Sequence, residues 1–173
     1  MKNELRHLLN RLSEGDRDVQ NTAIVQLGIL LEKSTSDTDN NDSSGLILEQ
    51  SVAGLEISKT DARLICDKLY DFAVTAEDGS PAIWALGKAF SSYTLELLIS
   101  LLCLKGSVFN DASIWQLLVA IDNLMPLLSS YSSSSHAHSA KYIQLKSKLN
   151  KYAKSDNNQL AKLAQKIRLE LLG

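Results

Sequence analysis

Apolar residues recur every three or four positions along most of this chain, which is the spacing of one face of an α-helix. Residues 3–12 carry four leucines on one such face, and residues 18–33 carry an aliphatic face that includes Leu27. No segment shows the alternation that predicts a half-buried strand. The pattern predicts an all-α protein with eight or nine helices. Eight helices are expected over residues 3–12, 18–33, 58–76, 79–90, 91–106, 110–130, 140–154 and 157–172. A short segment over 46–55 would be the ninth.

Polar residues, glycine and proline indicate where several of these helices begin and end. Asp16 or Asp18 can cap the second helix, and Ser80 is a candidate cap for a later one. Gly106 is placed to end the most apolar segment, which is the one we expect to be most buried. Pro126 should bend or break the helix that contains it.

Two polar segments interrupt the helical pattern. Residues 34–45 contain no apolar residue, and we expect them to form a mobile acidic loop. Residues 128–139 are rich in serine and predict a connector before two basic C-terminal helices.

Three segments of the chain can be laid over one another. Residues 22–31, 81–90 and 112–121 each begin with or near a small residue, followed by Ile, a bulky residue, a spacer and Leu. In the first two segments a glycine, Gly28 or Gly87, comes next. Internal similarity of this kind is typical of helical-repeat proteins.

The stretch "DRDVQNTAIVQLGIL" resembles one repeat of the HEAT-like, armadillo-type family, through an acidic residue, a valine, a small residue and Leu-Gly. These are Asp16, Val19, Ala23, Leu27 and Gly28. The resemblance is good over this one repeat, partial at 78–90 and faint near 111–121 and 156–172. It implies a short, irregular α-solenoid of stacked antiparallel helical hairpins, formed by a single domain over residues 1–173.

This resemblance suggests a reason for a glycine inside a helix. Glycine costs about 1 kcal/mol relative to alanine there, but a residue without Cβ lets a neighbouring helix approach closely. Gly28 and Gly87 are the candidate contact points. If residues 46–53 formed a full helix, the repeats beginning at 16 and 81 would fall on opposite members of their hairpins.

Charge is distributed unevenly along the chain, although the net charge is only −2. Residues 1–122 hold 18 acidic and 10 basic residues, a net of −8, whereas residues 123–173 hold 2 acidic and 8 basic residues, a net of +6. The acidic part favours a basic partner, with candidate binding residues Glu14, Asp16, Asp18, Asp37, Asp39, Asp42, Glu77 and Asp78. The basic part offers a weaker nucleic-acid surface through Lys141, Lys146, Lys148, Lys151 and Lys154.

Candidate chemistry is sparse. Residues 37–42 imitate the start of a calcium loop, but Asp42 and Leu48 occupy the places that need Gly and a bidentate Glu. The "HAH" at 136–138 lacks enough further ligands for a zinc site. We therefore expect no metal and no cofactor.

The resemblance to HEAT-like proteins also suggests one catalytic role, the processing of a damaged DNA base. Some HEAT-like proteins are DNA glycosylases that handle a damaged base with aromatic and acidic side chains. Trp84 and Trp115, with Asp78 and Asp111 nearby, invite the comparison. Residues 70–122 contain only two lysines and no arginine, which is too few for a phosphate-lined groove, so core packing of both tryptophans is the favoured interpretation.

Three features of the sequence bear on localisation: its longest apolar run, its N-terminus and its two cysteines. The longest apolar run, residues 97–104, is too short to span a bilayer, and no secretory signal is visible at the N-terminus. Cys66 and Cys103 lie in apolar helical patterns and are expected to be buried, reduced thiols. These features favour a cytoplasmic protein without a membrane segment.

The sequence thus predicts a non-catalytic protein-interaction module. A small cytoplasmic inhibitor or immunity-type protein that neutralises a basic partner, such as a toxin nuclease, fits its size and charge. The alternative is a nucleic-acid-binding or base-processing HEAT-like protein that uses the basic C-terminal helices. A third possibility is a structural subunit of a larger complex.

Overall fold

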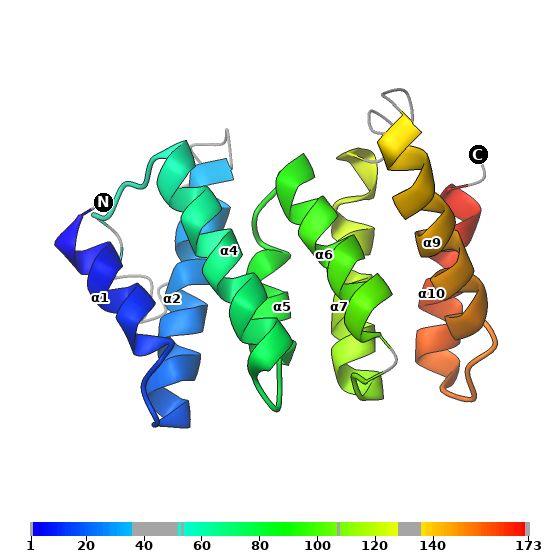
Figure 1. Cartoon of the computed structure of the whole chain (residues 1–173), viewed down its shortest axis with the longest axis horizontal. Coiled ribbons are helices and arrows are strands. Elements are labelled where there is room, and N and C mark those ends of the chain that lie inside the picture. Colours follow the sequence, from blue (N-terminus) through cyan, green and yellow to red (C-terminus); the bar gives the residue numbers. More distant parts are fainter. Residues whose placement is uncertain (1, 36–51, 53, 107, 128–135, 172–173) are drawn as a thin grey trace. The chain divides into compact units, whose positions relative to one another are not determined.

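The structure, a computed structural model of the chain, describes residues 2–35, 52, 54–106, 108–127 and 136–171. Within them the regular elements are helical and no strand forms, which confirms the all-α class. None of the helices described is long and apolar enough to cross a membrane. The eight helices with complete bounds in this part of the chain are α1 (Asn3–Arg11), α2 (Arg17–Thr35), α4 (Lys59–Thr75), α5 (Ser80–Leu86), α6 (Ser92–Lys105), α7 (Asp111–Asn123), α9 (His136–Tyr152) and α10 (Asn158–Glu170) (Figure 1).

Two predicted boundaries differ from the structure. Helix α2 continues to Thr35, two residues into the predicted acidic loop, and the rest of that loop lies outside the described residues. Helix α9 begins at His136, so the predicted connector over 128–139 is too long at its C-terminal end. Both helices extend into polar segments, where no hydrophobic periodicity indicates a helix.

The chain forms two compact units, Met1–Phe90 and Ser91–Gly173. In the first unit α1 packs on α2, α4 packs on α5, and α2 also packs on α4 and α5. Figure 1 shows α1 and α4 on the near side of this unit, with α2 and α5 behind them. Its core is aliphatic and includes the fully buried side chains of Leu5, Ile24, Leu27, Leu31, Ile65, Leu69, Ile83 and Leu86.

Capping residues fix where the helices of this unit begin. Asp16 Oδ1 accepts the N–H groups of Asp18 at 2.8 Å and Val19 at 3.3 Å, so Asp16 is the cap of α2. Ser58 forms a capping box with Asp61 at the start of α4. Asp16 is thereby confirmed as a cap of its helix.

In the second unit α6 packs on α7 and α9, and α10 packs on α7 and α9. Asn110 Oδ1 accepts the N–H of Ser113 at 2.8 Å and so caps α7. Helix α7 ends at Asn123, with a turn at Leu124, which confirms the break predicted near Pro126.

The three similar segments occupy equivalent places in the helix pairs. Residues 22–31 lie in α2, residues 81–90 begin in α5, and residues 112–121 lie in α7. Each of these helices is the second member of a packed pair, α1–α2, α4–α5 or α6–α7. Among the described helices, the repeats at 16 and 81 therefore both fall on the second member of a pair, and the question of a helix over residues 46–53 lies outside the described residues, since only Val52 of that segment is described.

Gly28 lies where α2 and α5 approach closely. A Cβ built on Gly28 would lie 3.0 Å from Trp84 Cζ3, 3.2 Å from Ala85 Cβ and 3.3 Å from Ala85 Cα. Glycine therefore favours the close approach of the two helices, because a Cβ here would make tight contacts with both a side chain and the backbone of α5. Gly87 differs, since α5 ends at Leu86 and Gly87 is its C-cap.

We expect Gly28→Val to destabilise the protein by about 2 kcal/mol. The physical reason is that the added atoms overpack the contact with Trp84 and Ala85. Urea unfolding followed by circular dichroism measures the change in free energy. Gly15→Val is the matched control, since a Cβ at Gly15 meets nothing within 4 Å. Equal effects of the two substitutions would contradict a packing role for Gly28.

Gly106 and Tyr152 close the second unit at the end of α6. The Tyr152 hydroxyl donates a buried hydrogen bond to the Gly106 carbonyl oxygen at 2.5 Å. A Cβ on Gly106 would lie 2.6 Å from that hydroxyl oxygen, so glycine is needed as the C-cap, in agreement with the sequence. Burial raises the pKa of Tyr152, which keeps its hydroxyl protonated as a donor.

Tyr152→Phe should destabilise the protein by about 2 kcal/mol. The loss is expected because the buried Gly106 carbonyl is left without its donor. Thermal and urea unfolding would measure it. Tyr70→Phe is the control, because the Tyr70 hydroxyl makes no hydrogen bond within the described residues. A loss no larger than that of the control would show that this hydrogen bond contributes nothing net.

Candidate functional site

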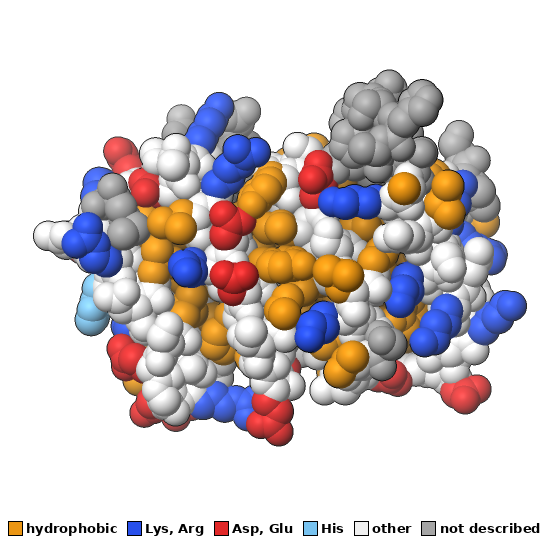
Figure 2. Space-filling view, viewed as in Figure 1, with side chains coloured by type: hydrophobic (Ala, Val, Ile, Leu, Met, Phe, Trp, Pro, Cys, Tyr) orange, Lys and Arg blue, Asp and Glu red, His pale blue; other side chains and the backbone are white. Residues whose placement is uncertain are grey.

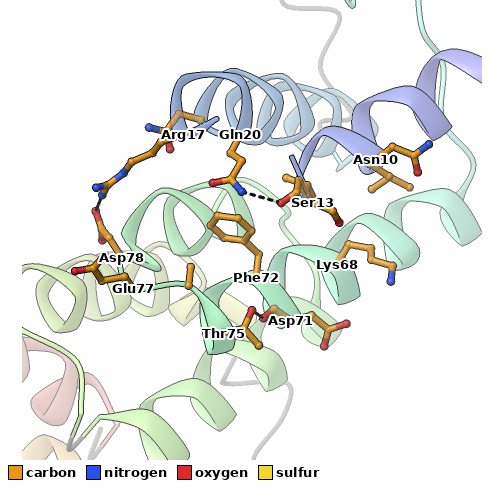
Figure 3. Close-up of a pocket in the computed structure, with 14 residues that line it drawn as sticks. Asn10, Ser13, Arg17, Gln20, Lys68, Asp71, Phe72, Thr75, Glu77 and Asp78 are labelled. Atoms are coloured by element: carbon orange, nitrogen blue, oxygen red, sulfur yellow. Dashed lines mark hydrogen bonds and ion pairs between the residues drawn. The ribbon is translucent and has the colours of Figure 1, made fainter. Parts of the chain in front are cut away.

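Two inter-helix turns and the first helical turn of α2, at one end of the first unit, carry five of the eight predicted acidic residues. Residues 12–16 join α1 to α2, and residues 76–79 join α4 to α5, at the same end of this unit (Figure 1). Arg17 Nη2 donates to Asp78 Oδ2 at 3.1 Å and links the two turns (Figure 3). We call this surface the acidic edge, and it consists of Glu14, Asp16, Asp18, Glu77 and Asp78.

Asp78 has a structural role at this edge. Its Oδ1 accepts the Ser80 N–H at 3.0 Å, while Oδ2 pairs with Arg17. The hydrogen bonds from the Ser80 N–H and hydroxyl, followed by the Arg17 charge, lower the pKa of Asp78. The prediction that Ser80 is the cap of α5 was wrong: Ser80 is the first helical residue, and Asp78 accepts its N–H.

The other carboxylates of the edge differ in what they do. Asp16 caps α2, as described above. Glu14, Asp18 and Glu77 are exposed, and their side-chain oxygens make no hydrogen bond or ion pair with the described residues. These three are therefore the carboxylates that a partner can reach without breaking an internal contact. The remaining predicted residues, Asp37, Asp39 and Asp42, lie outside the described residues.

A groove of about 600 Å³ lies beside this edge, between α1 and α4, with the first turns of α2 between them. The Phe72 ring stands in the middle of it, next to the amide of Gln20 (Figure 3). Lys68 and Asp71 lie along the α4 wall, and the Arg17–Asp78 pair closes one end.

The sequence does not predict this groove, because it does not show which apolar residues of α4 remain accessible. Phe72 shares the apolar face of α4 with Leu69, yet Leu69 is fully buried and Phe72 only half-buried. The helical period places both on the same face, and only the spacing of α1 from α4 decides which one remains accessible.

The predicted basic surface lies in the second unit, and several of its lysines have partners there. Lys141 Nζ is 3.8 Å from Glu96 Oε2. Lys146 and Lys151 lie over the rings of Tyr142 and Tyr152, with Nζ 4.8 and 5.9 Å from the ring centres. Figure 2 shows Lys and Arg side chains over α9 and α10, where Lys148 and Lys154 belong to the same predicted set.

The two tryptophans have different surroundings. Trp84 is half-buried against Gly28, and Lys88 Nζ lies 5.3 Å from its ring centre. Trp115 is 40% exposed, so the prediction that both tryptophans pack in the core was wrong for Trp115. The physical reason is that Trp115 lies about 100° around α7 from Ile114, to one side of the buried face that Ile114, Leu118 and Ile121 form.

The described residues offer no group of three or more side chains that could hold a metal ion. The candidate loop at 37–42 and the side chains of His136 and His138 lie outside the description. Neither cysteine forms a disulfide: Cys66 is buried as expected, whereas Cys103 is only half-buried, and this partial burial raises the pKa of its thiol.

Comparison with known proteins adds no relative: the chain matches no protein-family model, no curated protein and no solved structure.

Asp78→Asn should cost up to about 1 kcal/mol at pH 7. The neutral amide loses the charge that favours the Ser80 N–H and Arg17. The folded-state pKa of Asp78 is depressed, so its carboxylate stabilises the fold above the unfolded pKa near 3.8 and ceases to do so as pH falls through the folded pKa. The difference between variant and wild type should shrink to zero below that pH.

Urea unfolding of both proteins at pH 7 and at acid pH measures this difference. Glu77→Gln is the neighbouring control and should be neutral at both pH values, since its carboxylate has no partner in the described residues. A difference for Asp78→Asn that does not change with pH would contradict an ionic role for Asp78.

Proposed function

We propose that the protein is a non-catalytic protein-binding module whose acidic edge binds a basic partner protein. The observation that carries this proposal is the exposure of Glu14, Asp18 and Glu77 on two inter-helix turns and the first helical turn of α2, which are held by caps and by the Arg17–Asp78 pair. Charges held in fixed positions without internal partners can steer an oppositely charged protein and select it.

The architecture supports the same proposal. Packed pairs of antiparallel helices, α1–α2 and α4–α5 in one unit and α6–α7 and α9–α10 in the other, are the units from which HEAT-like α-solenoids are built. We propose that this chain is a short, irregular member of that class. Such modules bind partners on their helix faces and inter-helix turns, without chemistry of their own.

A small inhibitor or immunity-type protein that neutralises a toxin nuclease is the specific role we propose. A nuclease must bind a polyanion and therefore carries a basic surface, which an acidic inhibitor can cover. Cysteines that form no disulfide, as Cys66 and Cys103 do not, fit a reducing compartment such as the cytoplasm.

The test compares affinity capture by the tagged wild-type protein and by the triple variant Glu14→Gln/Asp18→Asn/Glu77→Gln. The wild type should retain one stoichiometric basic protein, and the variant should bind that protein about tenfold or more weakly, with a shallower salt dependence. Asp16 and Asp78 are left unchanged because both support helix N-termini. Mass spectrometry identifies the partner, and titration measures both dissociation constants.

A charge-matched control neutralises three exposed carboxylates outside the acidic edge, Glu4→Gln/Glu56→Gln/Asp156→Asn. Equal losses in the two triple variants would show that net charge, and not the acidic edge, governs binding. Elution with nucleic acid alone, removed by nuclease or salt, would overturn the proposal in favour of the basic α9–α10 surface. Self-association without any partner would favour a structural subunit.

A further inference from the structure

We infer that the groove between α1 and α4 binds an arginine side chain of the basic partner, with the guanidinium stacked on the Phe72 ring. The inference rests on the proposed function, since the groove adjoins the acidic edge and the partner is taken to be basic. It adds a short-range recognition site to a surface that otherwise acts through charge.

The aromatic floor of the groove is the first part of this site. Phe72 belongs to the last turns of α4, lines the groove and is half-buried, so part of its side chain remains accessible. Figure 3 shows the ring between the α2 side chains above it and the α4 wall. The face of an aromatic ring is electron-rich and attracts a cation placed over it.

A fixed hydrogen-bond acceptor lies next to that ring. Gln20 Nε2 donates to the carbonyl oxygens of Glu14 at 2.5 Å and Leu12 at 3.3 Å, so both contacts set the orientation of the amide. Gln20 Oε1 accepts no hydrogen bond from the described residues, and it faces the groove side of the amide (Figure 3). A donor seated over Phe72 can reach this oxygen.

The charges around the groove favour a cation over an anion. Asp71, Glu77 and Asp78 line it, against Lys68 and Arg17. Arg17 and Asp78 are paired at 3.1 Å and offset each other, which leaves Asp71 and Glu77 against Lys68 among the described residues of the walls. Asp71 is exposed on the α4 wall and adds negative charge to this side of the groove.

The geometry selects arginine over lysine. A guanidinium is planar, so it can stack on the ring while its N–H groups, which lie in the same plane, reach acceptors at the rim. An ammonium group is compact, strongly hydrated and unable to stack. The Gln20 Oε1 atom is the acceptor that lies beside the ring (Figure 3).

The test uses two labelled peptides of equal length and charge, one of alternating Arg and Gly and one of alternating Lys and Gly, bound to the full chain and followed by fluorescence anisotropy. The arginine peptide should bind several-fold more tightly. Phe72→Leu, which keeps an apolar side chain but removes the ring, should weaken the arginine peptide about threefold to tenfold and leave the lysine peptide unchanged. Phe90→Leu, at an exposed phenylalanine outside the groove, is the matched control.

A second measurement needs no variant. When the arginine peptide binds wild-type protein, the ring current of Phe72 should move the resonances of one arginine side chain upfield, with nuclear Overhauser contacts to the ring protons. Absence of both effects on a bound peptide would overturn the groove site even if Phe72→Leu failed to fold.

The outcomes separate this inference from the proposed function. Equal affinity for the two peptides, or equal effects of Phe72→Leu and Phe90→Leu, would overturn the arginine site and leave the acidic edge standing. If Glu14→Gln/Asp18→Asn/Glu77→Gln left both affinities unchanged while Phe72→Leu still weakened the arginine peptide, the acidic edge would fail and the groove would stand. Absence of binding by either peptide would overturn the arginine site, while the capture experiment would still decide the acidic edge.

Discussion

The first unit depends on the close approach of α2 to α5, which is possible because position 28 has no side chain. Trp84 and Ala85 occupy the space that a Cβ of Gly28 would need. With α5 this close, the turn after α4 meets the turn before α2, and Arg17 reaches Asp78. The unfavourable helix propensity of Gly28 is thus offset by the packing of α2 against α5 and by the ion pair that this packing permits.

Acidic residues at this edge serve two purposes that sequence composition cannot separate. Asp16 and Asp78 accept backbone N–H groups at helix N-termini, where the partial positive charge of the helix favours a carboxylate. No such hydrogen bond or ion pair within the described residues involves the side-chain oxygens of Glu14, Asp18 and Glu77. The division follows from hydrogen-bond geometry: a carboxylate caps a helix only when it stands two or three residues before the N–H groups that need an acceptor. Five acidic residues therefore reduce to three that are free to bind a partner.

The helices were predictable because their signals are local. The apolar period placed α1, α2, α4, α6, α7 and α10, and short-range capping chemistry placed Asp16 and Gly106 at helix ends. Ser80 was misassigned because the helix begins at Ser80 itself, and the Asp78 carboxylate, two residues earlier, accepts the Ser80 N–H. Exposure of Phe72 depends on how far neighbouring helices stand from its side chain. A periodicity along one helix carries no information on that distance, so the groove could not be predicted from the sequence.

Charge and shape act over different ranges at this surface. Attraction between exposed charges extends about 10 Å at 0.1 M salt, so the acidic edge can raise the rate of encounter with any basic protein but distinguishes poorly among them. Discrimination needs contacts that form only at close range and only with the right group. A ring with an oriented amide oxygen beside it, as Phe72 and Gln20 provide, has that character, because a misplaced or non-planar cation cannot satisfy both. An inhibitor that must find one basic protein among many nucleic-acid-binding proteins would need both kinds of interaction, and in this unit they lie side by side.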